Sequence, residues 1–247
     1  MSSLYLRDDL DAESAAEHVS ITGAEARHAV TVGRTRVGET LSIGNGRGLI
    51  VTGPVVSASP TELVIESHRV EQVDASVPRL VLVQALAKGD RDELAVQAAT
   101  ELGVDAVIPW AASRSVSRWD AQKAVKGRER WASIAREATK QSIRPWLADV
   151  HELASTKQLA ALAGSVRMLL LEPTAEEPIT EYDLVHGKAA GSDIVIVVGP
   201  EGGIAPAELE QLTAAGATAV RLGASVLRTS TAGPAAIAVL NARLGRW

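Results

Sequence analysis

Hydrophobic and polar residues follow two different patterns along the chain, and the change comes near residue 72. In the first part, short apolar stretches alternate with turn residues, the stretches being Leu41–Ile43, Leu49–Val56 and Glu62–Val70. Glycine and asparagine, as in Gly44-Asn45-Gly46, tolerate the positive φ of tight hairpins. The pattern therefore predicts a hairpin-rich β module, with a short helix at Glu25–Val32.

From residue 73 onward, compact apolar strands alternate with helices. The predicted strands are Leu80–Leu86, Ala106–Trp110, Arg167–Glu172, Ile194–Gly199 and Ala219–Gly223, and the predicted helices are Arg91–Leu102, Ala121–Ser142, Pro206–Ala215 and Ser230–Arg243. A strand that is apolar at every position is buried on both faces, which is typical of a parallel sheet covered by helices. We therefore expect a β domain over residues 1–72 and an α/β domain over residues 73–247.

Composition narrows the possible classes of protein. The 247 residues include no cysteine, which excludes disulfide frameworks and thiol nucleophiles and favours a reducing, cytoplasmic location. The five histidines show no metal-ligand spacing, so no metal site is expected. No apolar run approaches the roughly 20 residues that span a bilayer, and the first residues lack the features of a signal peptide. We therefore expect no membrane partner.

The net charge of −5 argues against a nucleic-acid partner until charge is counted by segment. Residues 110–150 hold nine basic and four acidic side chains, and also four of the five tryptophans. Cations neutralise phosphates and aromatic rings stack on bases, so this stretch suits an RNA-facing surface. The alternative is a solvated amphipathic helix whose tryptophans anchor it to the core, and the sequence favours that reading.

A glycine-rich turn, Gly199-Pro200-Glu201-Gly202-Gly203, directly follows the apolar strand at Ile194–Val198. Ligands of open α/β sheets bind at the carboxyl ends of strands, and glycine lets a ligand approach the main chain closely. The spacing matches neither the dinucleotide fingerprint nor a P-loop, which disfavours a nucleotide-dependent oxidoreductase. A purely structural turn remains the other interpretation.

A second stretch of the same kind runs from Arg221 to Ala232. A strand ends at a glycine, an irregular loop with apolar residues follows, and a helix begins with hydroxyl residues able to cap it. The apolar residues of the loop line a slot or fill the core, and the sequence leaves both open. Arg228 lies between two strand-end loops, which is an unusual place for a structural arginine.

Together these stretches resemble the RsmE family of SPOUT-class RNA methyltransferases. The resemblance rests on the glycine turn followed by Leu222-Gly223 and Leu227-Arg228-Thr229, and on further motifs at Gln84–Asp90, Thr100–Val104, Arg136–Arg144, Arg27–Val30 and Gly44–Gly48. These motifs occur in the family's order over nearly the whole chain. The resemblance implies an α/β fold, a SPOUT-type trefoil-knotted parallel sheet with helices on both faces, preceded by a small PUA-like β-barrel.

The resemblance also implies an activity. Members of the family are homodimers that transfer a methyl group from S-adenosylmethionine to N3 of a uridine in the decoding region of 16S ribosomal RNA, in the small ribosomal subunit. The residues matching the family's cofactor pocket are Leu170, Leu171, Glu172, Gly199, Pro200, Glu201, Gly202, Gly203, Leu222, Gly223, Ser225, Val226 and Leu227.

Two further sets of residues complete the candidate site. Arg228 is the candidate catalytic residue, because a guanidinium can orient the uracil as negative charge develops on it. The candidate RNA surface combines basic residues of both domains, namely Arg34, Arg36, Arg47, Arg114, Lys140 and Arg144.

One departure from the family pattern concerns proton removal. The family commonly has Leu-Arg-x-Glu-Thr-Ala, and here Ser230 stands in the place of the glutamate. Uridine N3 must lose its proton, and with Ser230 at this place no general base is assigned. The absence of cysteine excludes a thiol adduct, so direct transfer is expected. The alternative function is a SPOUT-fold RNA-binding or ribosome-assembly factor with weak or no catalysis.

Overall fold

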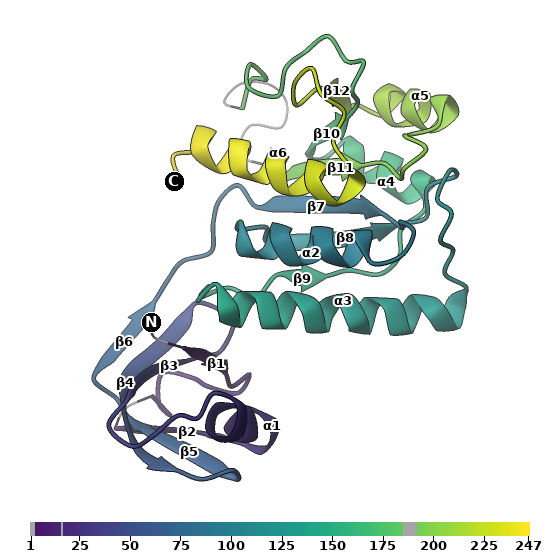
Figure 1. The fold of residues 1–247 in the computed structure, drawn as a ribbon. Helices are drawn as coiled ribbons and strands as arrows, with labels where there is room; N and C mark the ends of the chain where they lie inside the picture. The colour runs from purple at the N-terminus through teal and green to yellow at the C-terminus, as the bar shows by residue number, and fades with distance from the viewer. Residues whose placement is uncertain (1–2, 16, 185–191) are drawn as a thin grey trace. The chain divides into compact units, whose positions relative to one another are not determined.

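The structure is a computed structural model and describes residues 3–15, 17–184 and 192–247 (Figure 1). The chain forms two compact units. The first comprises Met1–Ala75 together with Thr139–Leu147, and the second comprises Ser76–Ala138 together with Ala148–Trp247. The boundary expected after residue 72 thus lies close to the first division, whereas nothing in the sequence pattern indicates that residues 139–147 return to the first unit.

The first unit is a six-stranded mixed sheet in the order β1-β3-β4-β5-β2, with β6 paired to β4. Its strands are β1 (Leu4–Leu6), β2 (His18–Thr22), β3 (Thr40–Gly44), β4 (Leu49–Ala58), β5 (Glu62–Glu66) and β6 (Arg69–Gln72). The helix α1 (Gly23–Arg27) continues into one π-helical turn at His28–Val32. The predicted strand Glu62–Val70 is therefore two strands, and the predicted helix begins two residues earlier than expected.

A glycine explains why the chain bends between β5 and β6. A Cβ atom at Gly53, in the middle of β4, would lie 1.7 Å from the carbonyl oxygen of Glu66. The close approach of these two backbones ends β5 and lets β6 pair with the first half of β4. Val19, Ile43 and Leu63 belong to a cluster of buried apolar side chains that forms the core of this unit.

The second unit is a six-stranded, entirely parallel sheet in the order β12-β10-β11-β7-β8-β9. Its strands are β7 (Leu80–Ala85), β8 (Ala106–Trp110), β9 (Asp149–Val150), β10 (Arg167–Leu171), β11 (Ile194–Val198) and β12 (Thr218–Val220). Its helices are α2 (Arg91–Glu101), α3 (Ala121–Gln141), α4 (Thr156–Ala163), α5 (Pro206–Ala214) and α6 (Thr229–Arg243), and the end of α3 from Thr139 onward belongs to the first unit. The expected α/β architecture is confirmed, and only β9 and α4 lack a counterpart in the predicted elements of this unit.

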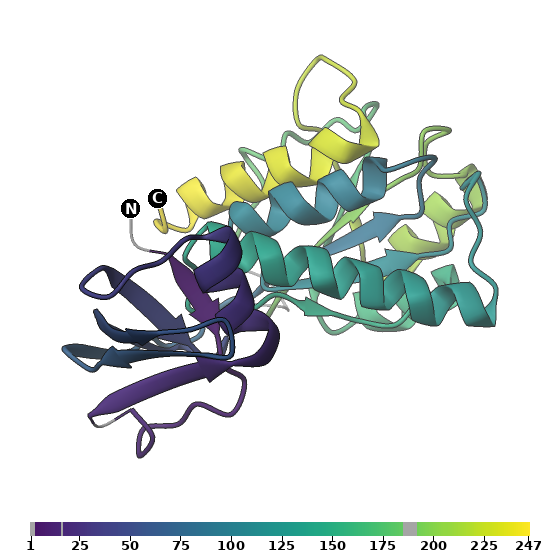
Figure 2. The same ribbon diagram turned by 60° about the horizontal axis from the view of Figure 1, so that its bottom comes forward.

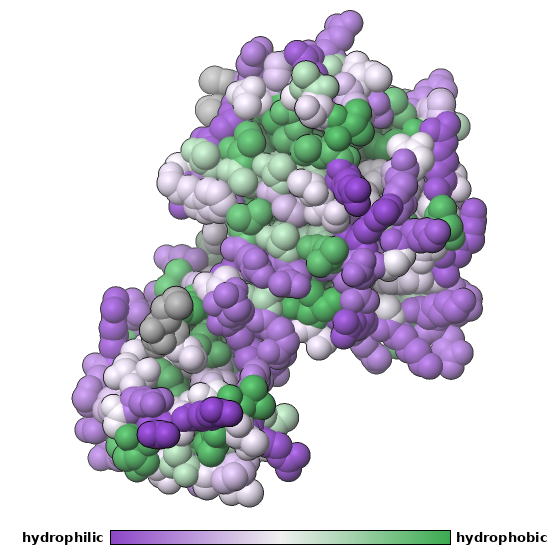
Figure 3. All heavy atoms as spheres, viewed as in Figure 1, coloured by the Kyte–Doolittle hydropathy of each residue, from purple (hydrophilic) through white to green (hydrophobic). Residues whose placement is uncertain are grey.

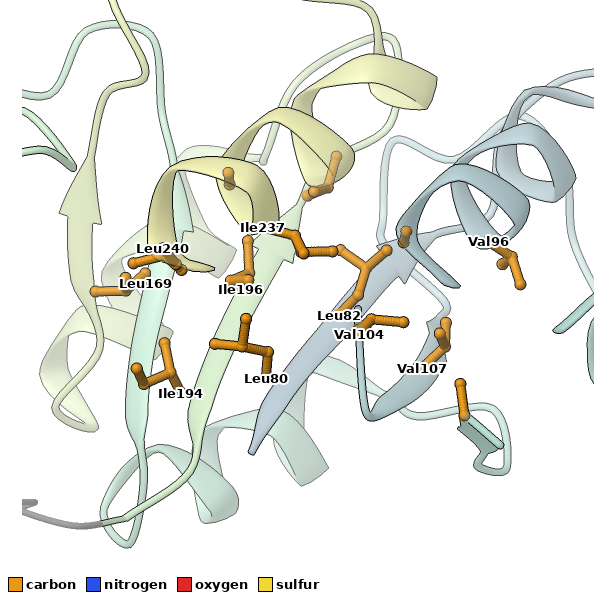
Figure 4. Packing of buried hydrophobic residues seen from close by; sticks show 14 of the residues in the cluster. Leu80, Leu82, Val96, Val104, Val107, Leu169, Ile194, Ile196, Ile237 and Leu240 are labelled. Carbon is orange, nitrogen blue, oxygen red and sulfur yellow. The ribbon is translucent and has the colours of Figure 1, made fainter. Parts of the chain in front are cut away.

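Helices cover both faces of this sheet. Side chains at alternate positions of β7, such as Leu80 and Leu82, pack with residues of α2, α3 and α6, while Val81 and Val83 pack with residues of α4 and α5. Figures 1 and 2 show α2, α3 and α6 side by side, and Figure 4 shows Leu82 and Ile196 beneath Ile237 of α6. Burial on both faces is why these strands are apolar throughout.

A second glycine determines how closely α6 packs against the sheet. A Cβ atom at Gly233 would lie 2.9 Å from Cδ1 of Leu82 and 3.4 Å from Cγ2 of Val198. Without a side chain at this position, the helix packs closely against β7 and β11. The first turn of α6 is thereby held at the carboxyl ends of those strands.

The tryptophans of the basic stretch serve mainly as anchors. Trp110 and Trp131 are buried, and the ring of Trp119 packs edge-on against Trp131 with centroids 5.4 Å apart. The indole of Trp146 donates a hydrogen bond to the carbonyl of Val73, within the first unit. The interpretation of this stretch as an amphipathic helix anchored by aromatic residues therefore describes it better than a row of rings that stack on bases.

Among the described residues, no helix is both long enough and apolar enough to cross a membrane.

Candidate functional site

A cavity of about 460 Å³ lies at the carboxyl ends of the parallel strands in the second unit. Its walls come from three segments far apart in the sequence, which follow β10, β11 and β12, together with Arg91 at the start of α2. The carboxyl ends of adjacent parallel strands meet at one edge of a sheet, so these segments converge there. The volume falls within the range of small-molecule sites.

Nearly all the residues predicted to bind the cofactor line this cavity, as does Arg228. The exception is Leu170, which is fully buried in the core on the α4–α5 face of the sheet. Successive side chains of a strand point to opposite faces, so Leu171 and Leu170 cannot face the same space. Sequence reasoning missed several lining residues, namely Arg91, Pro173, Val198, Ile204, Thr229 and Ala232.

The missed residues differ in whether a sequence motif points to their place in the cavity wall. Val198 and Ile204 directly flank the predicted glycine turn, so extending the motif by one residue at each end finds them. Arg91 lies more than 100 residues before the turn, directly after the motif at Gln84–Asp90, and nothing in that motif connects it with the glycine turn. Its place in the wall follows from the pairing of β7 with β11, which no pattern in the sequence specifies.

The glycine turn is held by Glu201. Its carboxylate accepts hydrogen bonds from the main-chain N–H of Lys88 and from Nη1 of Arg91, each at 3.0 Å. Burial alone raises the pKa of Glu201, but hydrogen bonds from its own amide, from Lys88 and from Arg91 outweigh burial and hold the pKa below its usual value. Glu201 is therefore ionised at neutral pH.

One contact holds the other side of the turn directly, and a second group of contacts fixes the helix that follows the turn. Nη1 of Arg114 donates to the carbonyl of Gly202 at 2.9 Å. The buried carboxylate of Glu208, in the first turn of α5, accepts hydrogen bonds from the amide and hydroxyl of Ser113 and from the hydroxyl of Thr156, at 2.8–2.9 Å. The turn is thus fixed in place by side chains from several elements before any ligand binds.

The third wall is the start of α6 and the loop before it. Residues 222–228 form no helix or strand, so their main-chain N–H and C=O groups are not used in the hydrogen bonds of a helix or sheet. Arg228 is the N-cap residue, with an extended backbone and an exposed side chain. The hydroxyl of Thr229 does not cap the helix, as the sequence suggested, but donates to the carbonyl of Gly199 at 2.9 Å.

The cavity presents both charges and an apolar surface. Carboxylates come from Glu172 and Glu201, and guanidinium groups from Arg91 and Arg228. Leucine and valine side chains of all three walls provide the apolar part. Such a site suits a ligand with an aromatic portion and a zwitterionic portion. Within the described residues, no group of three or more His, Cys, Asp or Glu side chains could hold a metal ion.

Three of the predicted RNA-binding residues lie at the surface of the first unit. Arg34 and Arg36 are exposed in the loop after the π-helical turn, and Arg34 has a positive φ of 54°. Val32, the last residue of that turn, and Val37, in the loop, are 69% and 63% exposed. Arg47 is exposed as well, and its Nη2 donates to the carbonyl of Asp8.

The other three predicted RNA-binding residues have internal contacts. Lys140 is only 6% exposed and forms an ion pair with Glu25 at 3.1 Å, so its ammonium group is already paired inside the first unit. A buried lysine requires such a partner, which the sequence could not reveal. Arg144 is half-buried, and the Arg114 guanidinium is bound to the glycine turn.

Comparison with known proteins agrees with this geometry. The family model described as RNA methyltransferase domain matches residues 74–241, and the one described as RNA methyltransferase PUA domain matches residues 21–66. Ribosomal RNA small subunit methyltransferase E of Mycobacterium tuberculosis is 41% identical over 92% of this chain and 87% of its own length. This chain belongs to the ribosomal RNA small subunit methyltransferase E family. The Bacillus subtilis member is 36% identical over 86% of this chain and 85% of its own length.

Solved structures confirm the fold expected for a methyltransferase E. The crystal structure of the Neisseria gonorrhoeae member, bound to S-adenosylmethionine, superposes with a TM-score of 0.85 and 25% identity over 98% of each chain. A crystal structure described as a hypothetical protein has a TM-score of 0.82 and 31% identity, over 96% of this chain and 97% of its own. The fold class is SPOUT-type, with a trefoil-knotted parallel sheet after a PUA-like domain.

Proposed function

We propose that this protein transfers a methyl group from S-adenosylmethionine to N3 of a uridine in the decoding region of 16S ribosomal RNA. The observation that carries the proposal is the cavity at the strand ends, where the residues matching the family's cofactor pocket converge with Arg228 at its edge. Relatives named as small-subunit ribosomal RNA methyltransferases cover most of this chain, which supports the choice of substrate.

The cavity fits the chemistry of the proposed cofactor. Leu171, Val226 and Leu227 provide apolar contacts for an adenine ring, and the irregular backbone of residues 222–228 provides amides and carbonyls for its edges. Charged lining residues suit the amino-acid end of the molecule. When bound, S-adenosylmethionine supplies an electrophilic methyl group on a sulfonium.

The residues of the chain act mainly by positioning and electrostatics. Arg228 holds the uracil and stabilises the negative charge that develops as N3 loses its proton. The glycine turn, fixed by Glu201 and Arg114, keeps the cavity in shape without reorganisation. Ser230 is half-buried and carries no carboxylate, so it supplies no general base, and the proton of N3 passes to solvent water as the methyl group leaves the sulfonium and bonds to N3. With no cysteine in the chain, a thiol adduct on the uracil is excluded.

The direct test uses small ribosomal subunits from a strain in which the gene is deleted. The purified protein and S-adenosylmethionine should restore one methyl group to their 16S ribosomal RNA, and mass spectrometry of nuclease fragments should locate it on N3 of a uridine. Calorimetry should show that the protein binds S-adenosylmethionine. Binding of the cofactor without methylation would instead favour an assembly factor, and a methyl group on another atom would contradict the assignment of N3.

We propose that Arg34 and Arg36 contact the RNA backbone. Replacing both by alanine should weaken RNA binding and reduce the slope of log Kd against log salt concentration by about 1.4, since each phosphate contact to single strands contributes about 0.7. The measurement is a fluorescence titration of a 16S RNA fragment at several salt concentrations. Arg69→Ala is the control, because Arg69 is exposed in the same unit and already pairs with Glu71. An unchanged slope in the double variant would contradict the proposal.

We propose further that the protein is a homodimer and that α6 lies in the interface. Apolar side chains gather over α6 (Figure 3), and Leu94 of the adjacent α2 is 49% exposed. Ala238→Glu, at a half-buried position of α6, should convert dimers to monomers in sedimentation velocity experiments. Ala132→Glu, on the exposed face of α3, should leave the dimer intact. A monomeric wild type would overturn this part of the proposal.

The proposed substrate also indicates the cellular compartment in which the protein works. Ribosomal RNA is assembled into subunits in the bacterial cytoplasm, so we propose that the protein works there. The absence of cysteine is consistent with that reducing compartment.

A further inference from the structure

Two consecutive hydrogen bonds link the interior of the sheet to two walls of the cavity. Gln84, in β7, donates from Nε2 to Oγ1 of Thr229 at 2.9 Å, and Thr229 donates to the carbonyl of Gly199 at 2.9 Å. Gln84 is fully buried and Thr229 is 6% exposed. Hydrogen bonds in such surroundings are stronger than in water, and breaking one leaves a costly unpaired group. We name these two bonds the Gln84–Thr229 relay.

A third contact fixes the direction of the relay. Nε2 of Gln84 also donates to the carbonyl oxygen of Ala85 at 3.1 Å, and a carbonyl can only accept. The amide nitrogen must therefore face both Ala85 and Thr229. Oε1 of Gln84 is buried and has no partner among the described residues, so no contact favours the opposite orientation. The Thr229 hydroxyl accepts from Gln84 and keeps its own hydrogen for Gly199.

The two ends of the relay are functional elements of the site. Thr229 is the first residue of α6 and directly follows Arg228, while Gly199 begins the glycine turn. The turn has other supports at Glu201 and Gly202. In contrast, the side-chain hydrogen bonds of the described residues 222–230 all belong to Thr229. The position of the start of α6 therefore depends more strongly on the relay than the position of the glycine turn does.

We infer that Gln84 and Thr229 are positioning residues for methyl transfer, which set the place of Arg228 relative to the glycine turn. This inference rests on the proposed function. Neither side chain needs to touch the uracil, because both act through the backbone of the first turn of α6. Since the glycine turn keeps its other supports while the start of α6 is one wall of the cavity, loss of the relay lowers kcat by a larger factor than it raises the KM for S-adenosylmethionine.

The test is a set of graded substitutions, assayed by transfer of a tritiated methyl group to unmethylated small subunits. Thr229→Val keeps the shape of the side chain and removes both hydrogen bonds. We expect its kcat to fall about tenfold to thirtyfold, less than the roughly 100-fold that a 1 Å misplacement can cause. Thr229→Ser keeps the hydroxyl and should recover most of the rate. Gln84→Met, which removes one of the two bonds, should lie between them.

A matched control separates positioning from stability. Thr100 is a buried threonine of α2 whose hydroxyl donates to Val96 in its own helix. Thr100→Val should lower the melting temperature about as much as Thr229→Val and leave kcat unchanged. If Thr229→Val instead keeps the wild-type kcat, or Thr229→Ser is folded and as slow as Thr229→Val, the inference is wrong.

A double variant tests whether the relay acts through Arg228. When Arg228 is already alanine, adding Thr229→Val should lower kcat no further, because the group being positioned is gone. Losses that multiply would show that Thr229 acts by another route and would overturn the inference. A wild-type protein that methylates no small-subunit RNA would contradict the proposed function itself, which is a different result from any of these.

Discussion

Arg228→Ala is expected to lower kcat for methyl transfer about 1000-fold, the upper range for loss of one group that stabilises developing charge. Arg228 lies at the edge of the cavity with an exposed side chain, directly before the first turn of α6. In the folded protein its guanidinium is therefore available to a substrate. Because the other cavity walls remain, the Kd of S-adenosylmethionine should change less than about threefold. Single-turnover kinetics and calorimetry measure the two effects separately.

Two further variants define what the arginine contributes. Arg228→Lys keeps the charge but lacks the planar fork of donors, so it should recover only part of the rate. Lys157→Ala removes an exposed cation from α4 and should have the wild-type rate. Wild-type turnover by Arg228→Ala would remove Arg228 from the mechanism.

Gly199→Ala should weaken binding of S-adenosylmethionine about 100-fold, which corresponds to about 2.7 kcal/mol. A Cβ atom there would lie 2.9 Å from Cγ1 and 3.0 Å from the main-chain nitrogen of Ile204. Ile204 is 6% exposed and packs in the core, so it cannot move aside easily. The turn must shift instead, and both residues line the cavity.

The control for this substitution is Gly164→Ala, at the end of α4. A Cβ atom at Gly164 would have no neighbour closer than 4.0 Å, and its backbone is right-handed helical. Calorimetry should give this variant the wild-type Kd. If Gly199→Ala bound the cofactor as tightly as the wild type, the glycine turn would not be part of the binding site.

The parts of the fold predicted from the sequence are those with a strong local pattern. The strand Ile194–Val198 is apolar at each position and ends in glycines, so both the strand and the turn are recognisable without any partner. In contrast, β1 has three residues and β9 has two, too few for a pattern. They are strands because β3 and β8 provide parallel partners, and that pairing is a property of the folded chain.

The site shows the same division at the level of single residues. The resemblance marks Leu170 and Leu171 together, but the alternation of a strand sends one into the core and the other to the cavity. Lys140 looks like a candidate for RNA binding until Glu25, 115 residues away, is seen beside it. Thr229 looks like a helix cap, yet its hydroxyl bonds to a carbonyl 30 residues earlier. The last two differences arise from contacts between distant parts of the chain, and the first arises from the alternation of side chains along a strand.

The composition of the cavity wall has a consequence for protein synthesis. The segment that follows β12 and the first turn of α6 supply one of its three walls, and they come after the other two walls in the sequence. A nascent chain that does not yet extend through the first turn of α6 lacks that wall. The cofactor can therefore stabilise only a chain that already includes it, and the earlier elements must fold without help from their ligand.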